Sequence, residues 1–107
     1  MSESRSNHES DLKSLRFQTR SKVVVKAAEV PEDMIRRAVG LADEAIANNL
    51  NEADIAQFLK SNFDKLYPAP WHCFVGKRFS SFVTHESGSF IYFYIVNLAV
   101  VLFRCKD

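Results

Sequence analysis

Apolar residues follow a helical period up to residue 67 and an alternating period from residue 71 onward. In the first half, apolar residues three or four positions apart form one stripe, which consists of Met34, Ala38, Leu41 and Ala45, beside Ile35, Ala42 and Ile46. This spacing is typical of a helix with one face against a core. Pro31 favours a helix start and the pair Asn48-Asn49 a helix end, so we predict a helix between them.

A second helix is predicted between Asn51 and Tyr67. The Asn51 side chain can cap the first turn, and Asp54 lies three positions later, as in a capping box. Pro68 and Pro70 prevent the helix from continuing past Tyr67. The apolar stripe of this helix consists of Ile55, Phe58, Leu59, Phe63 and Leu66. We interpret both stripes as the core-facing sides of their helices.

Short runs of β-branched and aromatic residues, separated by turn signals, begin at residue 71. We predict strands at residues 71–76, 79–86, 90–96 and 98–105, after a short strand at 23–25. Alternation in the third of these runs places Phe90, Tyr92 and Tyr94 on one face and Ile91, Phe93 and Ile95 on the other. Two helices can cover only one face, so the other requires a second sheet, most simply from another subunit. The predicted fold class is α+β, with two helices packed on an antiparallel sheet, and a dimer is expected.

Length and charge limit the classes of protein to which this chain can belong. At 107 residues, of which 47% are hydrophobic, it is long enough for one domain with its own core. The net charge of +1 argues against duplex DNA or an anionic membrane as the partner. We divide the chain into a flexible, Ser-rich tail at residues 1–21 and a domain at residues 22–107.

The cellular compartment is predicted from what the sequence lacks. The N-terminus has no apolar segment of the kind that a secretory signal needs. The longest apolar stretch is interrupted by Asn97 and is shorter than the roughly 20 residues of a membrane-spanning helix. Cys73 and Cys105 do not form a disulfide framework, so reduced thiols are expected. We therefore expect a soluble, intracellular protein.

Catalytic and metal chemistry is not predicted. His72 and Cys73 are neighbours on a predicted strand, so their side chains point to opposite faces and cannot act as base and nucleophile. The His and Cys residues show no metal-ligand spacing, and a chain with three Gly has no phosphate-binding glycine loop. We expect no enzyme activity, no metal and no cofactor.

Several short motifs follow one another between residues 54 and 94. They are Asp54-Ile55-Ala56, Phe63-Asp64-Lys65, Trp71-His72-Cys73, Val75-Gly76, Val83-Thr84-His85-Glu86 and Phe90-Ile91-Tyr92-Phe93-Tyr94. In this order they resemble the eight-kilodalton cytoplasmic dynein light chain family, and the resemblance covers residues 23–103. It implies the dynein light chain fold: a strand-crossing homodimer in which residues 79–84 pair with the sheet of the partner.

The resemblance also implies a non-catalytic function. Members of the family bind linear peptides, often with a Gln-Thr core, as an added strand in two equivalent grooves at the dimer interface. Two linked sites favour bivalent partners. The implied partners are the dynein intermediate chain and other proteins with short linear motifs, in the cytoplasm and the microtubule-associated dynein complex. The alternative is a dynein-independent dimerisation or sequestering hub with altered peptide preference.

Individual positions receive roles from the same resemblance. The groove edge is implied to consist of Phe79, Ser81, Phe82, Val83, Thr84 and His85. The groove floor is implied to include Phe90, Tyr92, Tyr94 and Ala99, with Lys26 near one end. Glu52 and Ala53 are implied to receive the target Gln. The dimer interface is implied to include His72, Ser80, Phe82, Val83 and Thr84. For the three aromatic floor residues, ordinary core packing is the alternative.

Four positions depart from the family pattern. Ser80 replaces a Gly in the crossing strand, Phe82 replaces a Tyr, and Ala53 replaces a Lys. The lost phenol and ammonium are hydrogen-bonding groups worth about 1 kcal/mol each when satisfied, so we expect the peptide preference to differ. Val96 replaces a turn Gly. Because a β-branched residue resists positive φ, we expect a reshaped turn or Asn97 in the left-handed region.

The tail contains Phe17-Gln18-Thr19, which resembles the Gln-Thr core that family grooves bind. An autoinhibitory or chain-linking role is one hypothesis, and a coincidental match is the alternative. Only three residues separate Thr19 from the first predicted strand, which restricts how the tail could reach a groove of its own protomer.

Overall fold

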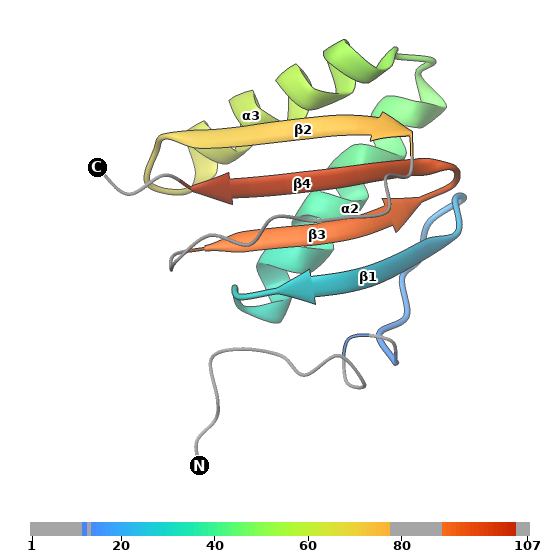
Figure 1. Cartoon of the computed structure of the whole chain (residues 1–107), viewed down its shortest axis with the longest axis horizontal. Helices are drawn as coiled ribbons and strands as arrows, with labels where there is room; N and C mark the ends of the chain where they lie inside the picture. The colour runs from blue at the N-terminus through green and yellow to red at the C-terminus, as the bar shows by residue number, and fades with distance from the viewer. Residues whose placement is uncertain (1–11, 13, 78–88, 105–107) are drawn as a thin grey trace.

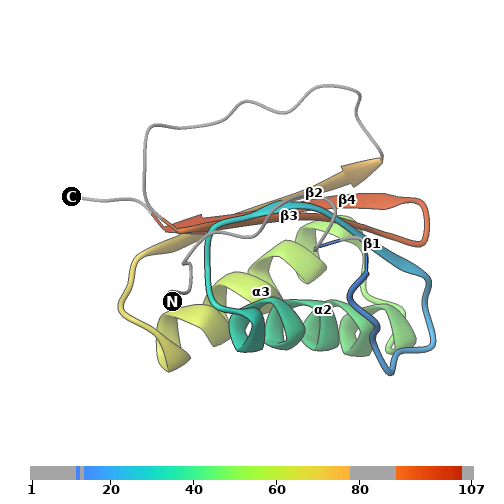
Figure 2. The same cartoon turned by 90° about the horizontal axis from the view of Figure 1, so that it is seen from below.

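The computed structural model describes residue 12, residues 14–77 and residues 89–104. The elements in these residues are β1 (Val23–Ala28), α2 (Glu32–Ala47), α3 (Glu52–Leu66), β2 (Trp71–Lys77), β3 (Phe90–Ile95) and β4 (Leu98–Arg104). The strands form an antiparallel sheet in the order β1-β3-β4-β2 (Figure 1). Both helices lie on the same face of the sheet (Figure 2). The predicted α+β class, with two helices on an antiparallel sheet, is confirmed.

Helix α2 follows Pro31, which has extended backbone angles and ends the preceding connection. Glu32 and Asp33 occupy the first turn, where the helix dipole favours negative charge. The helix ends at Ala47 with Asn48 as its C-cap, and Asn49 then adopts a φ of 62°. Its buried side chains are Ile35, Ala38, Val39, Ala42 and Ala45. The predicted helix is confirmed, and four of these five buried residues were named in its predicted stripe. Met34 and Leu41, also named there, are only half-buried.

Helix α3 is capped as predicted. The Asn51 side-chain oxygen accepts a hydrogen bond of 2.8 Å from the backbone N–H of Asp54. The buried side chains of α3 are Ile55, Leu59 and Phe63. Leu66 is 47% exposed, so its assignment to the buried stripe was wrong. It lies in the last turn, next to the extended Tyr67, where the chain already leaves the core.

The corner between α3 and β2 is held by one carboxylate and a group of rings. Asp64 Oδ1 accepts the backbone N–H of Trp71 at 2.7 Å, and its other oxygen pairs with the Lys60 ammonium. The Phe63 ring lies 4.9 Å from the rings of both Tyr67 and Trp71. The first residue of β2 is thereby attached to the end of α3, which sets where the edge strand begins.

Strand β1 is longer than the three residues predicted for it. Its pairing with β3 continues from Val23 to Ala28, with a bulge between Val25 and Ala27. Lys26, Ala27 and Ala28 have low intrinsic preference for strands, so this part of β1 was not predicted from the sequence. Backbone hydrogen bonds to β3 stabilise the strand here in place of side-chain preference. The predicted strand at residues 79–86 lies outside the described residues.

The β3–β4 turn differs from both sequence-based expectations. Val96 itself adopts the left-handed region, with φ 57°, and Asn97 does not. The Val96 N–H donates to the Lys22 carbonyl at 3.0 Å, which extends the β1–β3 ladder by one bond. A β-branched residue therefore occupies a conformation that sterics disfavour, and the surrounding strand pairing holds it there.

Candidate functional site

Alternate side chains of the sheet point away from the helices and form what we call the second sheet face. The opposite parity faces the helices: Ile91, Phe93, Ile95, Val100 and Leu102 belong to the main core cluster. Tyr92, Ala99 and Val101 form a separate buried cluster, with Ala27, Tyr94 and Phe103 packed against it. One sheet thus supports two apolar layers, and the helices cover only one of them (Figure 2).

Strand register arranges the second sheet face in three rows that cross the sheet. The first row contains His72, Phe103 and Phe90. The second row contains Phe74, Val101, Tyr92 and Ala27. The third row contains Gly76, Ala99, Tyr94 and Val24. Gly76 has no side chain and Ala99 has only a methyl group, so the third row is the shallowest part of this face, next to the Tyr94 ring.

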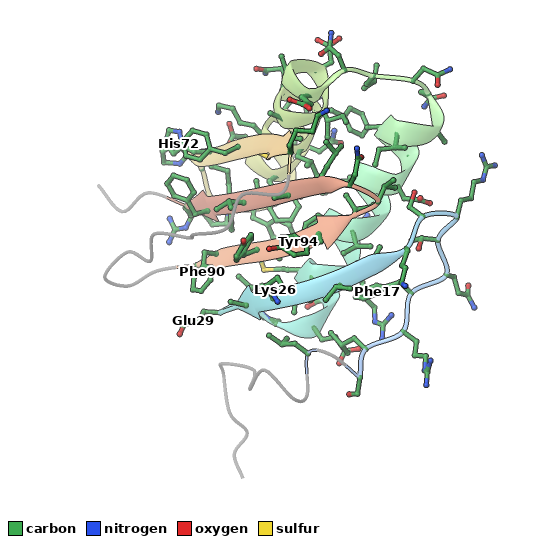
Figure 3. The ribbon with its side chains drawn as sticks, turned by 45° about the vertical axis from the view of Figure 1, so that its right-hand side comes forward. Phe17, Lys26, Glu29, His72, Phe90 and Tyr94 are labelled. Carbon is green, nitrogen blue, oxygen red and sulfur yellow. The ribbon has the colours of Figure 1, made fainter. Side chains whose placement is uncertain are left out.

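Two tyrosines and a lysine supply the polar groups of this face. Tyr92 and Tyr94 pack edge to face, with ring centroids 5.7 Å apart, and the Tyr92 hydroxyl donates to the Tyr94 hydroxyl at 3.4 Å. Burial, together with this hydrogen bond, raises the pKa of Tyr92 to about 12, so its phenol stays neutral. The Lys26 ammonium lies 5.4 Å from the centroid of the Tyr94 ring, a cation–π distance (Figure 3).

The other end of the face, at β2, carries exposed aromatic surface. Phe74 is 62% exposed although it lies in the middle of a strand. The Phe103 ring lies 5.4 Å from His72 and 5.8 Å from Phe74. Among the described residues β2 pairs only with β4, so this aromatic group lies along a sheet edge. Exposed edges with large apolar side chains are typical of surfaces that another chain covers.

The structure therefore groups some of the residues singled out from the sequence and separates others. Tyr92, Tyr94, Ala99 and Phe90 share one face, with Lys26 beside Tyr94. Glu52 and Ala53 lie in the first turn of α3, in the helix layer alongside β2 (Figure 1). Outside the described residues are Phe79, Ser80, Ser81, Phe82, Val83, Thr84, His85 and Cys105.

Phe74 and Phe103 were not singled out individually from the sequence as interface residues. Both share the parity of His72, which was singled out, so the alternation rule would have placed them on the same face. The exposure of Phe74 could not be read from the sequence, because it depends on β2 lying at the edge of the sheet.

The environments of Cys73 and His72 do not favour catalysis. Cys73 points to the helix layer and packs against the main core, and burial raises the pKa of its thiol to about 12. A protonated, buried thiol is a poor nucleophile. The adjacent His72 lies on the second sheet face, so the two side chains diverge as predicted. Among the described residues there is no group of three potential metal ligands, and no helix is long and apolar enough to span a membrane.

Comparison with known proteins places the chain in a family. The profile of the family described as dynein light chain type 1 matches residues 22–105. The chain is 49% identical over 81 residues to "Dynein light chain 1, cytoplasmic" of Debaryomyces hansenii, across 76% of this chain and 89% of that protein. It is 48% identical over 82 residues to "Dynein light chain, cytoplasmic" of Emericella nidulans, across 77% and 87% of the two chains.

The fold is also found in a solved structure of low sequence identity. The dynein light chain-like domain of a calcium-binding protein from Fasciola hepatica superposes with a TM-score of 0.70 at 19% identity. The superposition covers 84% of this chain and 99% of that one. On the profile match and the two relatives, the chain belongs to the dynein light chain type 1 family, a non-catalytic family.

Proposed function

We propose that this protein is a homodimeric dynein light chain that binds linear peptides by strand addition. The observation that carries the proposal is the second sheet face. It is apolar, it lies opposite both helices, and it ends at an edge strand with a 62% exposed Phe74. Family membership supplies the context in which such a face is used.

The dimer half of the proposal rests on the edge formed by β2. His72, Phe74 and Phe103 offer aromatic surface at this edge, and the long apolar strand would be a liability in an isolated protomer. A strand from a partner, at residues 79–84, would pair with β2 and cover these rings. In this arrangement Ser80, Phe82, Val83 and Thr84 would belong to the interface together with His72.

The peptide-binding half assigns different work to different parts of the site. The edge to which a peptide adds through backbone hydrogen bonds would come from residues that precede β3 in the chain. These are Phe79, Ser81, Phe82, Val83, Thr84 and His85. Phe90, Tyr92, Tyr94 and Ala99 would form the floor, with the Lys26 cation at one end. Glu52 and Ala53, at the capped start of α3, would receive the target Gln. Because Ala53 is exposed and has no hydrogen-bonding side chain, we expect weaker selection for that Gln.

The proposed partners follow from the relatives, which are cytoplasmic dynein light chains by name. We propose the dynein intermediate chain and other proteins with short linear motifs as targets, in the cytoplasm and on the microtubule-associated dynein complex. The altered position Ala53 favours, as a second candidate, a hub that acts outside the motor. Co-precipitation of a dynein intermediate chain would support the motor subunit, and its absence from a complex that retains other peptide partners would support the hub.

Isothermal titration of a Gln-Thr-containing peptide into the full chain tests the proposed function. We expect one peptide per protomer. The substitution Tyr94→Ala, which removes the aromatic ring of the third row, is expected to weaken binding at least about tenfold. A peptide with Ala in place of both Gln and Thr is the matched control for sequence preference.

Two results would count against this function. One is the absence of a heat of binding at high micromolar concentrations of the peptide. The other is unchanged affinity in Tyr94→Ala, with circular dichroism showing that the variant is folded. If the Ala-substituted peptide bound with undiminished affinity, strand addition would remain the proposed binding mode, and a preference for Gln-Thr would be excluded.

A further inference from the structure

The residues that precede the family-matched region lie against α2. Residues 14–21 come before the match, which begins at residue 22, yet they make specific contacts with the helix (Figure 2). The Arg36 guanidinium lies 5.3 Å from the centroid of the Phe17 ring, and Arg36 Nη1 donates to the Arg16 carbonyl at 2.6 Å. The Arg36 side chain also pairs with Glu32 at 2.8 Å, which holds the guanidinium in place on the helix.

A second attachment lies two helical turns further along α2. The two carboxylate oxygens of Asp43 accept the consecutive backbone N–H groups of Arg20, at 3.2 Å, and Ser21, at 3.1 Å. Just before this point, the Thr19 hydroxyl donates to the Ser21 carbonyl at 2.7 Å. Arg36 and Asp43 are seven positions apart, so both lie on the same side of the helix. Together they bind the two ends of one short segment.

Apolar side chains bind the same stretch of chain to the core. Leu12 is 2% exposed and belongs to the main core cluster, and Leu15 and Phe17 pack against that cluster. The Lys22 carbonyl then accepts the Val96 N–H, which connects the segment directly to the sheet. From residue 14 to residue 20, exposed and half-buried positions alternate. This pattern is typical of an extended segment that packs one side against the protein.

We infer that residues 14–21 form a strap, an added element of the folded unit that is clamped across the flank of α2 by Arg36 and Asp43. The strap has its own recognition chemistry: an aromatic anchor under a guanidinium, and a carboxylate that accepts two backbone amides. It holds Gln18 and Thr19 on the helix layer, on the other side of the sheet from Tyr92 and Tyr94. In the docked state the Gln-Thr pair therefore does not occupy the second sheet face of its own protomer.

Limited proteolysis of the full chain tests the strap, because Arg16 and Arg20 are themselves trypsin sites. We expect the bonds after both residues to be cleaved at least about tenfold more slowly than in a synthetic peptide of residues 10–25, since docking removes the segment from the protease. Phe17→Ala and Asp43→Ala should each speed cleavage after Arg20 by about tenfold. The matched controls are Gln18→Ala, an exposed neighbour of the anchor, and Glu44→Ala, an exposed neighbour of the carboxylate, each with an expected change below about twofold.

Hydrogen exchange keeps the test independent of global unfolding. In the unaltered chain the amides of Arg20 and Ser21 should be protected, and Asp43→Ala should release these two amides while β3 keeps its protection. Cleavage of the unaltered chain at the rate of the free peptide would overturn the strap. So would equal cleavage rates in the Asp43→Ala and Glu44→Ala chains, or loss of protection spread evenly over β3.

Discussion

At the scale of single residues, Val96 is the position where the chain departs most from its intrinsic preference. Its φ of 57° places a β-branched side chain in the left-handed region, which costs roughly 1–2 kcal/mol for an L-residue. The β3–β4 ladder continues to Leu98 and the Val96 N–H is bonded to Lys22, so the register of three strands enforces this conformation. The turn is therefore strained, and the strand pairing around it offsets the energetic cost.

Relieving that strain should stabilise the protein. We expect Val96→Gly to increase the free energy of unfolding by about 1 kcal/mol, because Gly adopts positive φ without a steric penalty. Urea unfolding of both chains measures the difference. Asn97→Gly is the matched control: Asn97 lies beyond the positive-φ position, so added freedom there should be neutral or mildly destabilising. A stabilising effect of Asn97→Gly equal to that of Val96→Gly would contradict the assignment of strain to Val96.

At the scale of elements, the α3–β2 corner depends on the ionised Asp64 side chain. The hydrogen bond from Lys60 has the largest effect, and together with the Trp71 N–H it lowers the pKa of Asp64 below its ordinary value of 3.8. A carboxyl whose pKa is lower in the folded state stabilises the fold above its unfolded pKa. That contribution is lost as the pH falls through the folded pKa.

The pH dependence of an Asp64→Asn chain tests this corner. At pH 7 we expect a loss of about 0.5 kcal/mol, in the range of an exposed i,i+4 ion pair, because the amide oxygen can still accept the Trp71 N–H. The difference from the unaltered chain should shrink as the pH falls through the lowered pKa of Asp64, and vanish once that carboxyl is protonated and both chains are neutral at this position. Chemical unfolding across pH measures it. In a Lys60→Gln background the pH-dependent difference should be smaller, and an unchanged difference there would contradict the role of Lys60.

At the scale of the whole molecule, the unequal covering of the sheet is the main feature. Two helices cover one face, and within the described residues the other face carries its own apolar cluster and the exposed Phe74. The strap adds to the covered side, where its Leu15 and Phe17, together with the preceding Leu12, join the core. Stability of this molecule is therefore expected to depend on how the second sheet face and the edge at β2 are covered by another chain.

Sedimentation and thermal unfolding test this dependence. If the proposed dimer forms, we expect a mass twice that of the 12.2 kDa chain and an unfolding midpoint that rises with protein concentration, as for obligate dimers. Phe74→Glu should weaken association at least about tenfold, because it would place a charge in an apolar interface. Leu66→Glu is the matched control, since Leu66 is an exposed apolar residue on α3, which lies on the opposite face of the sheet from Phe74. A monomer at all concentrations, or equal association of the two variants, would refute the dimer.

Much of this architecture follows from local patterns. The stripe at Ile55, Leu59 and Phe63 predicted α3, and Asn51 with Asp54 predicted its cap, because side-chain spacing and capping act within one turn. The alternation of residues 90–95 predicted a sheet with two apolar faces, each of which must be packed against another layer. The extent of β1 past Val25 and the φ of Val96 were not predicted, because each depends on pairing with a strand distant in the chain. The exposure of Leu66 was not predicted either, because an apolar stripe does not show at which turn the helix leaves the core.

The sequence by itself determined the elements, their order, the parity of each strand and, through its motifs, the family. Periodicity is local, so it survives without knowledge of the fold. Only the tertiary structure decided which residues share the second sheet face, that β2 with Phe74 lies at an edge, and that residues 14–21 lie against α2. Those outcomes depend on strand order and on contacts such as Asp43 with Arg20, which join residues more than twenty positions apart. No local pattern specifies such contacts, since they form only when the helix layer and the sheet are already in place.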